Sequence, residues 1–235
     1  MAILGALEEI IVDGNLPART VYVACGHDEE IGGSEGAKYI AKQLVAENMN
    51  FEFILDEGTM MVSGIIPGYK EGPIALIGCA EKGFVNVEMT VTGPGGHSST
   101  PPIGSDNPLK IMAGAIVALE SNPIPPHFEK GTLFRDTLEH LARKVAFPFN
   151  IIFSNLFLFG YLLKFILVRA SNGAAASIRT TTAVTKMYGG EKLNAMPSEV
   201  KAFVNHRVHP GDSIQSVLDH DRYLQMLILY LCRLV

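Results

Sequence analysis

The sequence predicts an α/β protein in two parts. Residues 1–82 are expected to form a mostly parallel sheet with helices, and residues 83–216 a smaller α+β layer. In the first part, continuous apolar runs alternate with helical segments, which is typical of a parallel sheet covered on both faces. In the second part, apolar and polar residues alternate along the strands, which indicates a sheet with one face in water.

The first part is expected to begin with a helix at 1–11, where apolar residues recur at helical spacing. This segment lacks a basic stretch and a small-residue cleavage site, so it does not match a signal peptide. The expected parallel strands are the apolar runs at 20–25, 51–55 and 74–78. A second helix is expected at about 34–47.

The pattern changes at Gly83, where near-strict alternation of apolar and polar residues begins. The expected elements are a strand at 84–91, a helix at 107–120 and strands at 178–187 and 199–208. We therefore place a domain boundary near residue 82, ahead of an α+β domain.

An apolar insert at about 127–177 interrupts the α+β pattern. Within it, residues 145–168 carry only one charge, on Lys164, and are long enough to cross a membrane. Pro, Asn, Ser and Gly residues inside this stretch favour a buried or pocket-lining segment. An interfacial membrane patch and a true membrane span remain open as alternatives.

The composition limits the kind of protein. The chain has 235 residues, of which 48% are hydrophobic and 18% charged, and these values suit a folded protein. A net charge of -5 without a basic stripe argues against a nucleic-acid partner. The three cysteines lack CxxC spacing, so a zinc finger or a disulfide framework is not expected.

Acidic residues follow two of the predicted strands. Glu29 and Glu30 come after the run at 20–25, and Asp56 ends the run at 51–55. Ligands of open α/β sheets gather beyond the carboxyl ends of strands, and converging carboxylates need a cation to offset their repulsion. These residues are therefore expected either to bind a metal ion or to be acidic loop residues that face solvent.

Five motifs, GHDEEIGG, LDEG, GPGGHSSTPP, NAMPSE and NHRVHPGDS, stand in one order along the chain. In this it resembles the zinc hydrolase family of aminoacylase, carboxypeptidase S and succinyl-diaminopimelate desuccinylase. The insert is most similar to the N-fatty-acyl-amino-acid synthase/hydrolase branch. The resemblance implies a partial zinc-binding catalytic domain at 1–82 and an inserted lid, or dimerisation, domain at 83–216. The tail at 217–235 does not match the family.

The resemblance also implies roles for single residues in the first part. Glu29 matches the family's general base, Glu30 a zinc ligand, and Asp56 the carboxylate that binds the second of two zinc ions (Zn2+). The resemblance implies no metal role for His27, Asp28, His206 and His209, which are expected to be structural, and none for His220.

In the lid, His97 resembles a histidine that stabilises the oxyanion of the tetrahedral intermediate. In dimeric relatives that histidine enters the site of the neighbouring subunit, so a homodimer is expected. Asn194 and Arg207 resemble residues that hold the carboxylate of the substrate, which suits an N-acyl amino acid. Without the resemblance, His97 would more often be a turn residue, Asn194 could simply shape a turn, and Arg207 could be an ordinary solvent-facing residue of a strand.

The family pattern includes further metal ligands, an earlier His-x-Asp motif, a bridging Asp and a late His, that this sequence does not contain. The chain alone is therefore expected to bind zinc weakly and to have little or no hydrolase activity. The alternatives are a carboxypeptidase acting on peptides, a non-catalytic isoform acting only as a dimerising module, and a membrane-attached protein. The resemblance suggests that the full-length form is secreted.

Overall fold

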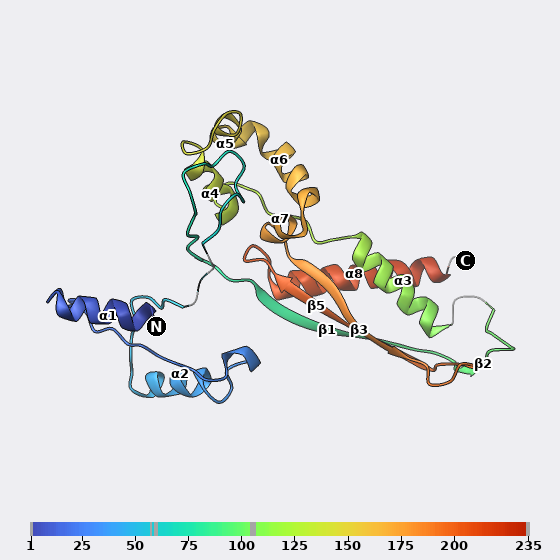
Figure 1. Ribbon diagram of the computed structural model, residues 1–235. Helices are drawn as coiled ribbons and strands as arrows, with labels where there is room; N and C mark the ends of the chain where they lie inside the picture. Colours follow the sequence, from blue (N-terminus) through green and yellow to red (C-terminus); the bar gives the residue numbers. More distant parts are fainter. Residues whose placement is uncertain (1, 57, 59–60, 104–106, 234–235) are drawn as a thin grey trace. The chain divides into compact units, whose positions relative to one another are not determined.

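The computed structural model describes residues 2–56, 58, 61–103 and 107–233, and side chains only as far as residue 226 (Figure 1). The chain divides into two compact units, 1–57 and 58–235. Each unit is described by itself.

The first unit contains two of the expected helices. Helix α1 spans Ala2–Val12, the short 3-10 helix η1 spans Glu29–Ile31, and helix α2 spans Ala37–Ala46. The predictions of helices at 1–11 and 34–47 are therefore confirmed within the usual uncertainty of helix ends.

The parallel strands expected at 20–25, 51–55 and 74–78 are not formed among the described residues, where these segments are extended but carry no ladder of backbone hydrogen bonds. The first two contact each other through side chains. Tyr22 meets Phe51 edge-on at 5.7 Å between ring centroids, and Arg19 forms an ion pair with Glu52. In the third segment, Ile74 forms an isolated antiparallel bridge with Val62, but no ladder follows it in the described part of the chain. Apolar composition makes a segment a candidate strand, but a sheet also needs a run of hydrogen-bonded neighbours.

The second unit is built on an antiparallel sheet, which confirms the mixed α/β class and the α+β pattern of this part. Strand β1 spans Gly83–Thr92, β3 spans Thr181–Gly189 and β5 spans Glu199–Val208, in the order β1-β5-β3. Alternate residues of β5 are buried, as the sequence pattern predicted. A two-stranded ribbon of β2 (Gly96–His97) and β4 (Ala195–Met196) extends one end of the sheet.

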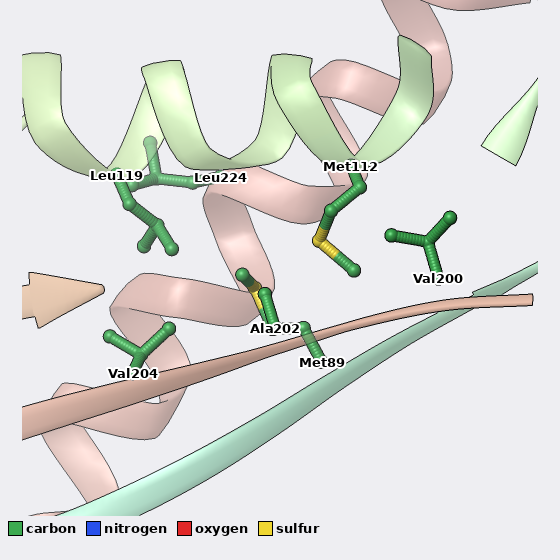
Figure 2. Close-up of a cluster of buried hydrophobic side chains, with 7 residues drawn as sticks. All are labelled: Met89, Met112, Leu119, Val200, Ala202, Val204 and Leu224. Atoms are coloured by element: carbon green, nitrogen blue, oxygen red, sulfur yellow. The ribbon is translucent and has the colours of Figure 1, made fainter. Parts of the chain in front are cut away.

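Two helices cover one face of this sheet: α3 (Pro108–Ser121) and α8 (Ile214–Arg233). Asn107 caps α3, because its side chain accepts a hydrogen bond from the Leu109 N–H at 2.9 Å. Figure 2 shows Met112 and Leu119 of α3 lying over the sheet, with Leu224 of α8 beside them. The cluster also contains Met89, Val200, Ala202 and Val204.

The start of the tail predicted at 217–235 belongs to this core. Within α8, Val217 and Leu224 are buried in hydrophobic clusters, and Asp221 is only 3% exposed. The first turns of the tail therefore pack as an integral part of the second unit.

The insert folds as four helices: α4 (Leu133–Leu141), α5 (Phe149–Ser154), α6 (Leu156–Ala170) and α7 (Asn172–Ser177). One face of α6 joins a buried cluster with Phe128, Leu138 and Ile178. Its other face is exposed and apolar, through Phe157, Leu158, Tyr161, Leu162, Phe165 and Ile166. Asn155 separates α5 from α6, and no described helix combines the length and the hydropathy needed to cross a membrane.

Candidate functional site

Glu29 and Glu30 lie on the exposed helix η1, directly after the buried Asp28. Because a 3-10 helix has three residues per turn, successive side chains diverge by about 120° and not by the 180° of a strand. The turn is closed by the Gly32 N–H, which donates to the Glu29 carbonyl at 2.8 Å, and Gly32 has a φ of 102°. Only glycine adopts this conformation without strain, so the glycine after the acidic pair is what allows the turn.

Asp28 ties this turn to the start of α2. Its Oδ2 accepts from the Glu35 N–H at 2.7 Å, and its carbonyl accepts from the Gly33 N–H at 2.8 Å. A Cβ on residue 36 would overlap Asp28 Oδ1, so the position of this carboxylate requires glycine at residue 36. The position of the two glutamates is therefore set by a buried neighbour that carries no predicted metal role.

Asp56, the other predicted ligand, is exposed near the end of the same unit. Carboxylate oxygens suit zinc, but a catalytic zinc site takes about three protein ligands. The part of the chain that the structure describes holds no group of three or more His, Cys, Asp or Glu side chains able to bind a metal ion. The residues described here thus do not make a complete zinc site.

In the second unit, the structure brings His97 and Asn194 together. Strands β2 and β4 pair antiparallel with His97 opposite Ala195, and the Ser98 N–H donates to the Asn194 carbonyl at 3.0 Å. Both residues are exposed. The strand β2 lies at the end of the sheet away from the insert (Figure 1). Two motifs almost a hundred positions apart in sequence therefore meet in one exposed site.

The hydrogen bonds of His97 decide which ring nitrogen carries the proton. The Ser99 N–H points at Nδ1, 3.2 Å away, and Ser99 Oγ lies 2.7 Å from the same atom. A backbone N–H can only donate, so Nδ1 is the acceptor and the neutral ring carries its proton on Nε2. His97 thereby presents an N–H donor of the kind that stabilises a developing oxyanion.

Arg207 lies at the other end of the sheet. It is exposed on β5, opposite Phe84 of β1, with its guanidinium carbon 5.8 Å from the Phe84 ring centroid. From Glu199, which follows the ribbon, Arg207 is roughly 25 Å away along the strand, at ~3.3 Å per residue. Within one chain, Arg207 is therefore separated from His97 and Asn194.

The sequence interpretation did not find two features that shape these sites. Ser99 holds the His97 ring. It could have been predicted from the GGHSS motif, in which it stands two residues after His97. His206 is fully buried and its Nε2 lies 2.9 Å from Asp221 Oδ2 in α8. Asp221 could not be found as the partner of His206 from sequence, because it lies on α8, a helix that no motif predicted.

An open groove of ≈ 580 Å³ lies beside the ribbon. Its polar wall is formed by Tyr188, Glu191, Lys192, Ser198, Glu199 and Lys201. Lys201 Nζ and Glu88 Oε1 are 2.9 Å apart, and this pairing lowers the pKa of Glu88 and raises that of Lys201. The groove includes neither His97 nor Asn194.

Comparison with known proteins places these motifs in a wider context. The family described as a peptidase dimerisation domain matches residues 79–220. Over 219 residues the chain is 43% identical to N-fatty-acyl-amino acid synthase/hydrolase PM20D1.1 of Danio rerio, covering 93% of this chain and 42% of that protein. It is 39% identical over 222 residues to probable carboxypeptidase S-like 2 of Dictyostelium discoideum, covering 94% and 41%.

Among solved structures, the chain is similar to the M20 family metallo-carboxypeptidase Sso-CP2 from Sulfolobus solfataricus. The TM-score is 0.40 at 16% sequence identity, over 63% of this chain and 40% of that one. The chain spans less than half the length of the curated relatives named above.

Proposed function

The chain belongs to the M20 metallopeptidase family, and on that premise we propose that it is part of a hydrolase of N-acyl amino acids. Likeness to an N-fatty-acyl-amino acid synthase/hydrolase along nearly the whole chain is the observation that carries this proposal. In the reaction, water adds to the amide carbon, the C–N bond breaks, and the amino acid nitrogen takes the proton. The reverse condensation of a fatty acid with an amino acid is part of the same proposal.

Members of this family are metal-dependent, and we propose two zinc ions, with Glu30 and Asp56 each as a ligand to one of them. Glu29, beside Glu30 on η1, acts as the general base that takes a proton from the attacking water. Its exposure next to the buried, tightly held Asp28 supports that role. The carboxylates described here do not complete either metal site, so the chain alone is expected to bind zinc weakly.

His97 stabilises the oxyanion through its Nε2–H, and Asn194 and Arg207 bind the carboxylate of the substrate. The fixed tautomer of His97 and its closeness to Asn194 support this assignment. Because Arg207 lies at the other end of the sheet, it and Asn194 can contact one small substrate only when two subunits contribute them. The match to a dimerisation domain supports this two-subunit arrangement.

The acyl group of the substrate is proposed to be a long apolar chain. The exposed apolar face of α6 supports this, because each CH₂ that it covers would contribute about 0.8 kcal/mol. Secretion of the full-length form belongs to the same proposal. A carboxypeptidase acting on peptides is the second candidate, and the likeness to probable carboxypeptidase S-like 2 favours it. A non-catalytic dimerising module is the third.

The test is a chimera in which this chain replaces the matching segment of the Danio rerio relative. We expect it to release fatty acid from a long-chain N-acyl amino acid faster than it cleaves a dipeptide. Glu29→Gln is expected to lower kcat by roughly a hundredfold or more, because a general base is lost. Glu47→Gln, which changes an exposed carboxylate at the end of α2, is the matched control and should keep full activity.

Preference of the chimera for the dipeptide would favour the carboxypeptidase, and a folded chimera without either activity would favour the dimerising module. The chain alone should be assayed in parallel with added zinc. Turnover by the chain alone that is lost on Glu29→Gln would contradict the expected incompleteness of the metal site.

A further inference from the structure

The two ends of the insert meet at one turn of the second unit. The His127 N–H donates to the Ile178 carbonyl at 2.6 Å, so the entry and the exit of the insert lie side by side. Asp212, in the turn between β5 and α8, binds both ends. Its Oδ1 lies 2.9 Å from His127 Nε2, and its Oδ2 accepts from Thr180 Oγ1 at 2.5 Å.

A second histidine from the same turn stacks on the first. The rings of His127 and His209 are parallel within 7°, with their centroids 4.8 Å apart. The His209 N–H donates to Thr180 Oγ1 at 2.8 Å, and His209 Nδ1 accepts from the Gly211 N–H at 3.0 Å. A Cβ on Gly211 would come within 3.0 Å of the His127 ring, so this turn packs closely against the stack.

The charges around the two rings accommodate one positive charge better than two. The groups that face the pair are Glu129 with its ion-pair partner Lys164 from the insert, Asp212 from the turn, and Lys82, which is bound to the Arg179 carbonyl. Asp212 directly balances a proton on His127. A second proton, on His209, is opposed by the desolvation of its ring and by the charge of His127, and both lower the pKa of His209.

We propose that Thr180, Asp212 and the stacked His127 and His209 form an acid-released clasp for the insert. The clasp holds the insert against the end of the sheet while at most one ring is charged. When both rings are charged, they repel each other across the stack, and the insert loosens. The large sheet core of Met89, Met112 and their neighbours is apolar and takes no part in this change.

The pH range follows from the direction of the pKa shift. Because the pKa of His209 is lowered in the folded protein, the unfolded ring binds protons more readily than the folded one. The clasp's contribution to stability is therefore fully present above the unfolded pKa of about 6.5, and it is lost as the pH falls below that value.

Amide hydrogen exchange of the full chain at pH 7.5 and pH 5, corrected for intrinsic rates, tests the clasp. We expect peptides from 127–178 to exchange about tenfold faster at pH 5, because local opening follows the second protonation, while β5 stays unchanged. His209→Asn keeps an acceptor for the Gly211 N–H but cannot be charged, and it should remove the acid response. His140→Asn, an exposed histidine of α4, is the matched control and should keep it.

Equal acceleration in the insert and in β5, no acceleration in the wild-type chain, or a normal response in His209→Asn would each overturn the proposal. Should His209→Asn not fold, NMR titration of the wild-type imidazole rings decides instead. The His209 ring must then titrate below the ordinary pKa of a histidine, because burial and the neighbouring His127 ring oppose its charge. A His209 ring that titrates at or above that ordinary pKa would also overturn the proposal.

Discussion

At the scale of single residues, the role proposed for His97 depends on the serine two positions later. Ser99→Ala removes the 2.7 Å contact between Oγ and Nδ1 and keeps the backbone N–H. We expect ¹⁵N spectra of the neutral wild-type ring to show the Nε2–H form. Ser99→Ala should increase the share of the Nδ1–H form, because the ring loses a hydrogen bond to Nδ1 worth about 1 kcal/mol. Ser98→Ala, next to it, should leave the spectrum unchanged. A dominant Nδ1–H form in the wild type would contradict the role proposed for His97.

The pair of His206 and Asp221 allows a second prediction at this scale. The side chains are 0% and 4% exposed, and their atoms lie 2.9 Å apart. Asp221→Ala leaves Nε2 of the buried His206 ring without its partner, while Nδ1 keeps Thr182 Oγ1 at 3.1 Å. The free energy of unfolding in urea should therefore fall by roughly 2–4 kcal/mol. Asp219→Ala, an exposed acid of the same helix, should change it by less than about 0.5 kcal/mol. Equal effects of the two substitutions would show that the buried pair is energetically unimportant.

At the scale of elements, α3 is held to the sheet by one face. Met112 is fully buried, whereas Val117 on the opposite face is 63% exposed. Met112→Ala should lower the free energy of unfolding by roughly 2–5 kcal/mol, because it leaves a cavity over the sheet. Val117→Ala should cost less than about 1 kcal/mol. Urea denaturation curves of both variants test this, and similar midpoints would contradict the packing seen in Figure 2.

Elements with strong periodicity were predictable from sequence. The strand at 199–208 has the predicted bounds, and the helices at α1, α2 and α3 are close to prediction. Val21, Tyr22 and Val23 have the composition of a buried strand, but they are half exposed and lack a ladder. Composition is local, whereas strand pairing depends on a partner from elsewhere in the chain.

At the scale of the whole molecule, the separation of Asn194 and Arg207 makes the proposed site dependent on two subunits. Sedimentation of the chain at micromolar concentration should therefore give about twice the 25.4 kDa of the monomer, as is usual for soluble oligomers with C2 symmetry. A dilution series should show the monomer at the lowest concentrations. A monomer at every concentration would count against the shared site.

The sequence by itself determined the family, and it supplied the candidate residues for the chemistry, because motifs such as GHDEEIGG and GGHSS are local strings that can be recognised without a fold. It also predicted the three strands of the main sheet and helix α3, since periodicity reflects burial on one face, but not the helices of the insert or α8. Only the tertiary structure decided that His97 meets Asn194, that Arg207 lies away from both, and that His127 stacks on His209. Those pairings join residues far apart along the chain, and packing, which no local pattern encodes, selects them.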